Sequence, residues 1–304
     1  MENRSICVES ILQLFHEKLT ELYDKSEISQ FIYILFEEWK GWSRAQLHLN
    51  LHKPVTTEDA ERFQKALADL VDNRPIQYII GHVLFFDLDL LVKPDVLIPR
   101  PETEELVQMI ITDNAHRRFE SFSVMDIGAG SGCIGLSIKK HLPFCNVLLI
   151  DISSNCLDLA RENADRNDCK VDLMEFDIID QSRWDDFQNY QLIVSNPPYV
   201  LISEKQQMHK NILTYEPHEA LFVPDENPLL FYNAIAEFSY LHLSRPGLLY
   251  FEINEKLGDE IKKMLIQKGF ERTEIIKDLN GKDRFIRAEI KIPVLDTSYW
   301  NVEH

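Results

Sequence analysis

Four consecutive residues, Asn196-Pro197-Pro198-Tyr199, have the side-chain types that can hold a planar nitrogen group still. The side-chain oxygen of Asn196 can accept a hydrogen bond from an N–H group. Both proline rings fix φ, and Pro198 favours an extended backbone at Pro197, so the Pro197 carbonyl has a set direction. The ring of Tyr199 can stack on an amide or a base. These residues predict a site for an –NH₂ group, and the alternative is a proline-rich loop without chemistry.

A second motif, Asp126-Ile127-Gly128-Ala129-Gly130-Ser131-Gly132, follows an apolar run and precedes a predicted helix. Such a loop turns backbone N–H groups and a helix N-terminus toward a ligand. Nineteen residues after Gly132, the apolar run 147–150 ends in Asp151. An acid at the end of this second strand is well placed to accept hydrogen bonds from ribose hydroxyls. The combination predicts a ligand that contains a nucleoside.

These two motifs leave the kind of nucleoside open. Residues 130–135 match the fingerprint G-x-G-x-x-G, which is typical of nicotinamide dehydrogenases. Against this, the glycines already begin at Gly128, and the Asn-Pro-Pro-Tyr sequence has no evident role in hydride transfer. Asp177 and Ile178, after a third predicted strand, suit the amino group and ring of adenine, although Asp177 is equally well explained as a solvated loop acid.

The elements that position these motifs fall into two parts. Up to about residue 83 the apolar spacing indicates helices, for example over 28–39 and after the cap residues Thr56-Thr57. The run 84–92 alternates like a strand or a hairpin. From about residue 120 strands alternate with helices, which predicts a parallel sheet covered by helices. The predicted strands are 123–127, 146–150, 171–176, 192–195 and 248–253, and the predicted helices are 132–140, 156–163 and 228–243.

The last part of the chain has a different pattern. A helix over 256–268 is followed by two predicted strands, 271–277 and 284–291, which are joined through Asn280-Gly281. Because Asn-Gly marks a tight turn, the last strand is expected to run antiparallel to its neighbour.

Composition limits the partners and the compartment. With 32 basic and 50 acidic residues the net charge is −18, which opposes direct binding to nucleic acid. Five scattered cysteines without a Cys-x-x-Cys pair argue against a zinc site and a disulfide framework, and they fit a reducing cytoplasm. No apolar run has the length of a membrane span, and residues 1–4 do not resemble a signal peptide.

In their order along the chain, the glycine loop, Asp151 and residues 196–199 resemble the class I methyltransferases that use S-adenosylmethionine. More closely, the chain resembles the release-factor glutamine methyltransferase family (PrmC/HemK) over about residues 74–287. Asn254 departs from the glycine that is usual in this family, and the tail after Ile292 matches no motif. The other motifs that carry the resemblance are Arg74-Pro75-Ile76-Gln77-Tyr78-Ile79-Ile80-Gly81, Ile98-Pro99-Arg100-Pro101-Glu102-Thr103-Glu104, Glu216-Pro217 with Ala220-Leu221, and Asp278-Leu279-Asn280-Gly281-Lys282-Asp283-Arg284.

The resemblance implies an α/β, Rossmann-like class I methyltransferase fold with a mostly parallel seven-stranded sheet, an antiparallel last strand and a small N-terminal all-helical domain. It implies a substrate-recognition domain at 1–83, a β connector at 84–98 and a methyltransferase domain at 99–304. Residues 1–83 are equally well explained as a packing accessory. The implied cofactor-binding residues are Gly128, Ala129, Gly130, Ser131, Gly132, Asp151, Asp177, Ile178 and Asn196. The implied substrate-binding residues are Asn196, Pro197, Pro198 and Tyr199. Of these, the implied catalytic residues are Asn196, Pro197 and Tyr199, and no metal is implied.

The implied substrate is the glutamine of the Gly-Gly-Gln motif in peptide chain release factors, methylated on its side-chain amide nitrogen (N5). Asn196 Oδ1 and the Pro197 carbonyl would accept both amide N–H groups, aim the nitrogen lone pair at the methyl group and stabilise the cationic nitrogen that forms. Tyr199 would pack against the amide, and no general base is required. Two alternatives stay open: methylation of adenine or guanine amino groups in nucleic acid, which the net charge opposes, and a noncatalytic nucleoside-binding scaffold.

Overall fold

The computed structural model describes residues 6–290, whose contacts divide the chain into two units. One unit comprises residues 6–82 together with Met208–Glu216, and the other comprises residues 83–207 and 217–290. Within the first unit, the Tyr215 hydroxyl donates a hydrogen bond to the Asp72 carbonyl at 3.0 Å. A segment from late in the chain thus packs with the N-terminal helices, and no pattern in the sequence indicates this grouping.

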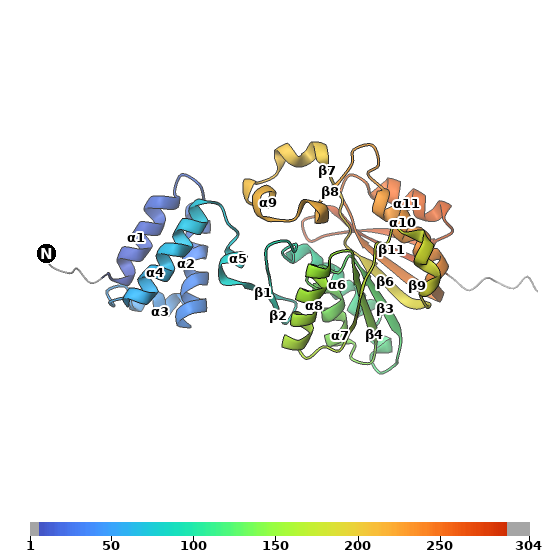
Figure 1. The fold of residues 1–304 in the computed structure, drawn as a ribbon, viewed down its shortest axis with the longest axis horizontal. Helices are drawn as coiled ribbons and strands as arrows, with labels where there is room; N and C mark the ends of the chain where they lie inside the picture. The colour runs from blue at the N-terminus through green and yellow to red at the C-terminus, as the bar shows by residue number, and fades with distance from the viewer. Residues whose placement is uncertain (1–5, 291–304) are drawn as a thin grey trace, which may run out of the picture. The chain divides into compact units, whose positions relative to one another are not determined.

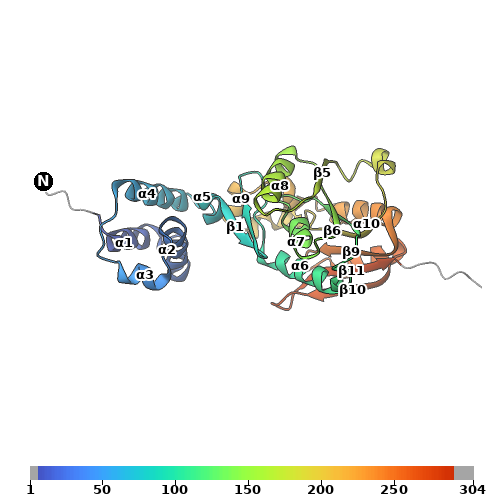
Figure 2. The same ribbon diagram turned by 90° about the horizontal axis from the view of Figure 1, so that it is seen from below.

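The first unit consists of helices, as the apolar spacing predicts (Figure 2). The hydroxyl of Thr56 accepts a hydrogen bond from the Asp59 N–H at 3.1 Å, which explains why a helix begins at Thr57. In the core, the rings of Phe36 and Phe63 stack with their centroids 4.4 Å apart. The helices are α1 (Val8–Leu19), α2 (Lys25–Lys40), α3 (Arg44–Leu49), α4 (Thr57–Val71), α5 (Ile76–Ile80) and α9 (Lys210–Tyr215).

The second unit contains a seven-stranded sheet with the strand order β10-β11-β9-β6-β3-β4-β5 (Figure 1). Neighbouring strands from β9 to β5 are parallel, whereas β11 pairs antiparallel with both β9 and β10. The predicted mostly parallel sheet with an antiparallel last strand is therefore confirmed. The strands are β3 (Ser123–Ile127), β4 (Asn146–Asp151), β5 (Asp172–Glu175), β6 (Tyr190–Ser195), β9 (Leu243–Glu252), β10 (Glu271–Lys277) and β11 (Asp283–Ile290).

Each face of this sheet has its own hydrophobic core, because successive strand residues point to opposite sides. In β6, for example, Leu192 and Val194 belong to one core and Ile193 to the other. Three helices cover the first core and two cover the second (Figure 1). They are α6 (Pro101–Asp113), α7 (Cys133–His141) and α8 (Ser154–Arg166) on one face, and α10 (Leu230–His242) and α11 (Gly258–Gln267) on the other.

The run 84–92 forms a hairpin of β1 (His82–Phe85) and β2 (Leu88–Leu91), one of the two forms expected for it. Other elements differ in detail from the sequence-based expectation. Strand β9 begins before residue 248, because polar residues at its start hide it from an apolar pattern. The pair β7 (Val200–Leu201) and β8 (Phe222–Val223) is too short to show periodicity. The tail after Ile292 lies outside the described residues.

Candidate active site

The carboxyl ends of the parallel strands meet at one edge of the sheet. At this edge Ile127 of β3 pairs with Ile150 of β4 and with Ser195 of β6, and Ser195 pairs in turn with Phe251 of β9. The residues that follow these positions include the glycine loop, the strand-end acid and the Asn-Pro-Pro-Tyr loop. The structure therefore brings the predicted motifs to the edge where open α/β sheets bind ligands.

The glycine loop uses a backbone that glycine adopts readily, with φ of 73° at Gly128 and 55° at Gly130. Its amides are engaged within the protein. The N–H groups of Gly128 and Ala129 donate to the Ile150 carbonyl at 2.9 and 3.0 Å, and the Gly130 N–H donates to Asp151 at 2.8 Å. The amides of Gly128, Ala129 and Gly130 therefore point to acceptors within the protein, whereas the sequence pattern indicated amides that face a ligand. Because a phosphate-binding loop needs free amides, the arrangement disfavours the dinucleotide alternative.

Asp126 occupies the helix N-terminus that such a loop would otherwise offer to an anion. Its Oδ2 accepts a hydrogen bond from the Gly135 N–H of α7 at 2.9 Å. A Cβ at Gly135 would lie 2.3 Å from Leu149 Cδ2, so glycine allows α7 to pack directly on the sheet. Burial, reinforced by the charge of Asp151, raises the pKa of Asp126 to about 7. Its Oδ1 is buried without a hydrogen-bond partner among residues 6–290.

Asp151 ends β4 with a buried carboxylate that two backbone amides hold. Its Oδ2 accepts from Gly130 N–H at 2.8 Å and its Oδ1 from Ser153 N–H at 2.9 Å. Burial raises the pKa of Asp151, and both hydrogen bonds oppose this rise. Each carboxylate oxygen keeps a lone pair that a ligand hydroxyl can use.

Asp177 and Ile178 follow β5 at the same edge. Asp177 Oδ1 accepts a hydrogen bond from the Ile179 N–H at 2.9 Å, so the carboxylate takes part in its own turn. Ile178 is buried, and its carbonyl accepts the indole N–H of Trp184 at 3.2 Å. These contacts are compatible with either interpretation of Asp177, an adenine partner or a loop acid.

The Asn-Pro-Pro-Tyr loop starts where β6 ends. The hydroxyl of Ser195 donates to the Ile127 carbonyl at 2.7 Å and so ties the loop to the strand that precedes the glycine loop. Pro197 is buried, and the half-buried members of the loop are Asn196, Pro198 and Tyr199.

Two side chains of this loop are connected to the buried carboxylate of Glu252, the last residue of β9. The Tyr199 hydroxyl donates to Oε1 at 3.0 Å, and the hydroxyl of Thr103 in α6 donates to Oε2 at 2.7 Å. Asn196 Nδ2 donates to Thr103 Oγ1 at 3.4 Å. Burial raises the pKa of Glu252, and its two hydroxyl donors oppose the rise. Burial and the Glu252 charge raise the pKa of Tyr199 above its usual range, so its hydroxyl stays a donor.

Three residues of this edge were not predicted as site residues. Thr103 and Glu252 are 149 positions apart, and a buried polar pair of this kind has no periodic signal in the sequence. Ile152, directly after Asp151, is 64% exposed. An exposed apolar side chain next to a strand-end acid offers a surface for a ligand ring. The position of Ile152 directly after Asp151 is the sequence feature that could have identified it.

Asn254, where the resemblance implies glycine, is buried next to the Asn-Pro-Pro-Tyr loop. Its Nδ2 donates to the Tyr199 carbonyl at 3.1 Å and to Glu204 at 3.2 Å, and its Oδ1 accepts from the Lys256 N–H at 3.0 Å. Glu204 also forms an ion pair with Lys256. Asn254 therefore fastens the loop backbone at Tyr199.

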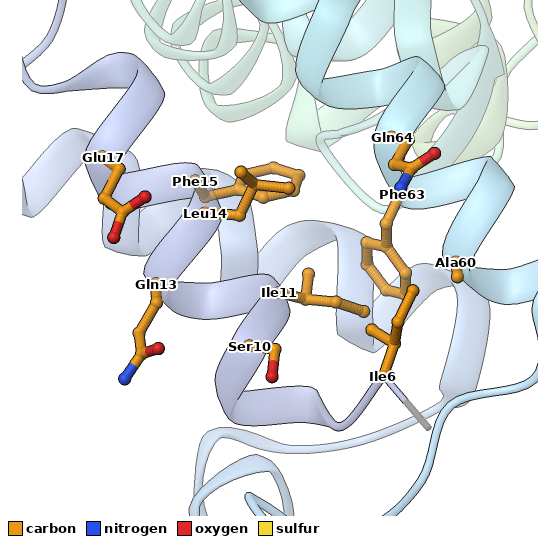
Figure 3. Close-up of a pocket in the computed structure, with 10 residues that line it drawn as sticks. All are labelled: Ile6, Ser10, Ile11, Gln13, Leu14, Phe15, Glu17, Ala60, Phe63 and Gln64. Atoms are coloured by element: carbon orange, nitrogen blue, oxygen red, sulfur yellow. The ribbon is translucent and has the colours of Figure 1, made fainter. Parts of the chain in front are cut away.

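Cavities also lie away from this edge, and the lining of one of them includes Asp87, Glu104, Gln108 and His141. Another, of about 240 Å³, lies in the helical unit, where Ile6, Ile11 and Phe63 point toward one another (Figure 3). Its only charged lining residue is Glu17. No group of three or more His, Cys, Asp or Glu side chains in the described part could hold a metal ion. Across residues 6–290, no helix combines the length and the apolar character of a membrane span.

A sheet of this order, with a glycine loop, a strand-end acid and an Asn-Pro-Pro-Tyr loop at its carboxyl edge, defines a class I methyltransferase. A methyltransferase small domain model matches residues 103–220, and a PrmC N-terminal domain model matches residues 10–81. The release factor glutamine methyltransferase of Flavobacterium psychrophilum is 41% identical over 278 residues, which cover 91% of this chain and 97% of the relative. That of Bacteroides thetaiotaomicron is 37% identical over 280 residues, with coverages of 91% and 98%. The chain belongs to the release factor glutamine methyltransferase family.

Solved structures agree with this fold. A methyltransferase from Pyrococcus furiosus superposes with a TM-score of 0.50 at 19% identity and covers 78% of this chain and 100% of its own. A 16S rRNA methyltransferase of T. thermophilus, solved with AdoMet and guanosine, has a TM-score of 0.51 at 16% identity, with coverages of 69% and 50%. At such identities the likeness concerns the fold alone.

Proposed function

We propose that this protein transfers a methyl group from S-adenosylmethionine to the side-chain amide nitrogen of the Gly-Gly-Gln glutamine in peptide chain release factors. Family membership supports the substrate, because the relatives described above are named for it. The position of Asn196 and Pro197 is the observation that supports the proposed methyl transfer. They lie at the end of β6, which pairs with the strand that leads into the glycine loop.

The residues of the edge fit S-adenosylmethionine. The engaged amides of the glycine loop suit a nucleoside without phosphate. Asp151 has lone pairs for ribose hydroxyls, and the exposed Ile152 suits an adenine ring. The buried, unpartnered Oδ1 of Asp126 suits a cationic or hydrogen-bond donor group. When bound, the cofactor supplies an electrophilic sulfonium methyl group.

The task of the protein side chains is to make a weak nucleophile react. An amide nitrogen shares its lone pair with its own carbonyl and therefore attacks poorly. Asn196 Oδ1 and the Pro197 carbonyl accept both N–H groups of the glutamine, which orients the nitrogen. These acceptors interact more strongly as the nitrogen becomes positive, so they stabilise the transition state more than the ground state. Tyr199 packs on the amide, and its neutral hydroxyl stays bound to Glu252.

The two parts of the chain are assigned different tasks in this proposal. Residues 1–83 form the domain that recognises the release factor, and residues 84–98 connect this domain to the catalytic domain, which comprises residues 99–304. Met208–Glu216 packs with the helices of the N-terminal unit. A location in the cytoplasm, where release factors act, is supported by the five cysteines, all of which are free thiols.

Mass spectrometry of a release factor after incubation with the protein and labelled S-adenosylmethionine tests the proposal. We expect one added methyl group on the Gly-Gly-Gln glutamine and none on a Gly-Gly-Ala variant of the same factor. Parallel incubations with rRNA and DNA test the nucleobase alternative. Label in the nucleic acid, and none in the release factor, would support that alternative. A noncatalytic nucleoside-binding scaffold would transfer label neither to the release factor nor to nucleic acid.

A further inference from the structure

We infer that Thr103 and Glu252 are positioning residues that together decide which way the side-chain amide of Asn196 points. The inference rests on the proposed function, in which Asn196 must offer its oxygen, not its nitrogen, to the glutamine amide. An asparagine amide can rotate by half a turn about its last bond, and the two orientations nearly coincide in shape. Something in the site must therefore distinguish the oxygen from the nitrogen.

The direction of the hydrogen bonds makes this distinction. An ionised Glu252 carboxylate only accepts, so the single hydroxyl proton of Thr103 is committed to Oε2 at 2.7 Å. Toward Asn196 the Thr103 oxygen then offers only lone pairs. Asn196 can satisfy it with Nδ2, as observed at 3.4 Å, but not with Oδ1. Because Oδ1 and Nδ2 point to opposite sides of the amide, Oδ1 is turned away from Thr103, and no residue in 6–290 donates a hydrogen bond to it.

The same carboxylate also fixes Tyr199, the aromatic residue of the Asn-Pro-Pro-Tyr loop. Glu252 Oε1 accepts the Tyr199 hydroxyl proton at 3.0 Å, which restrains the ring. The Glu252 backbone is held in turn by the hydroxyl of Tyr232 in α10, which donates to its carbonyl at 3.1 Å. The guanidinium of Arg284, at the start of β11, favours the ionised form of this buried acid. One carboxylate thus sets both the amide orientation of Asn196 and the position of Tyr199.

Thr103→Val keeps the shape of the side chain and removes the hydroxyl, so Asn196 loses its orienting acceptor. We expect kcat for methyl transfer to fall about 10- to 100-fold, the scale of a misplaced catalytic group, with KM for the release factor and affinity for the cofactor unchanged. Thr103→Ser keeps the hydroxyl and should restore most of the activity. Thr273→Val is the matched control, because Thr273 in β10 is buried and its hydroxyl has no hydrogen-bond partner in the described part.

Glu252→Gln tests the direction of the hydrogen bonds without removing them. The new –NH₂ group must face either Thr103 or Tyr199. Facing Thr103, it donates to the hydroxyl, whose proton then turns toward Asn196 and selects Oδ1. If the –NH₂ group faces Tyr199, the phenol proton loses the oxygen that accepts it in the wild type. Either outcome should lower kcat, although the variant keeps the shape and hydrogen-bonding capacity of the site.

A signal of the amide itself separates this inference from the proposed function. The side-chain ¹⁵NH₂ resonance of Asn196, assigned by its loss in Asn196→Ala, should shift in Thr103→Val and stay in place in Thr103→Ser and Thr273→Val. If the wild-type protein methylates no release factor, the proposed function fails while this spectrum still tests the orientation. An unmoved resonance, or a kcat for Thr103→Val equal to that of Thr273→Val, would overturn the inference.

Discussion

The carboxylate of Asp151 accepts a hydrogen bond from the Gly130 amide at 2.8 Å, so the acid at the end of β4 and the glycine loop after β3 form one structural unit. Burial raises the pKa of this carboxylate, and two backbone amides oppose the rise. A buried acid held in this way is a fixed acceptor at the ligand-binding edge.

Replacing Asp151 by alanine is expected to weaken cofactor binding. Loss of hydrogen bonds to a charged group costs about 1.5 to 3 kcal/mol, or roughly a 10- to 100-fold higher Kd. Isothermal titration calorimetry with S-adenosylmethionine measures this change. Asp158→Ala, on the exposed face of α8, is the control and should bind like the wild type. Unchanged affinity in Asp151→Ala would exclude a role in ribose binding.

Asn196→Ala should separate binding from chemistry. The variant loses the acceptor proposed for the glutamine amide, and we expect kcat to fall about 10²- to 10³-fold, as when an oxyanion-hole donor is removed. Cofactor affinity should be largely kept. Asn146→Ala, exposed at the opposite end of β4, serves as a comparison with normal activity. Full activity of Asn196→Ala would contradict the proposed mechanism.

The buried Asp126 should make stability fall as the pH rises. Its pKa is about 7 in the folded state against 3.8 in the unfolded chain, so between these values the folded protein binds the extra proton. The free energy of unfolding therefore decreases from pH 4 toward pH 7 and is lowest above the folded pKa. Asp126→Asn removes this titration. The free energy of unfolding of the variant, relative to that of the wild type, should therefore rise by about 2 to 4 kcal/mol between pH 4 and pH 8.

Urea unfolding of both proteins without cofactor at the two pH values measures this difference. Comparing the variant with the wild type at each pH removes the contributions of other titrating groups. A stability difference that does not change with pH would show that the pKa of Asp126 is the same in the folded and the unfolded protein.

Asn254→Gly is expected to loosen the Asn-Pro-Pro-Tyr loop, although the sequence resemblance implies glycine at this position. The variant loses the bonds to the Tyr199 carbonyl and to Glu204, for which we expect a loss of about 1 to 3 kcal/mol in unfolding free energy. Thermal unfolding measures this loss, and Asn254→Asp, which keeps the acceptor for Lys256, should also be destabilised. A variant as stable as the wild type would show that other contacts hold the loop.

Much of the catalytic unit could be predicted because its signals are local. Apolar strands that end in a glycine loop, in Asp151 or in Asn196 identify both a parallel sheet and its functional edge. The pairing of Thr103 with Glu252, and of Tyr215 with Asp72, could not be predicted, because tertiary packing alone brings such distant residues together. The engaged amides of the glycine loop were missed for a related reason, since their acceptor belongs to the neighbouring strand.

Methylation of a release factor is the most direct test of the proposed function. The wild-type protein, S-adenosylmethionine and a purified release factor are incubated, and peptides that contain the Gly-Gly-Gln motif are sequenced by mass spectrometry. We expect a mass increase of one methyl group on the glutamine side chain with the wild-type protein and no such increase with Asn196→Ala. An unmodified glutamine after incubation with folded wild-type protein that binds the cofactor would contradict the proposed function.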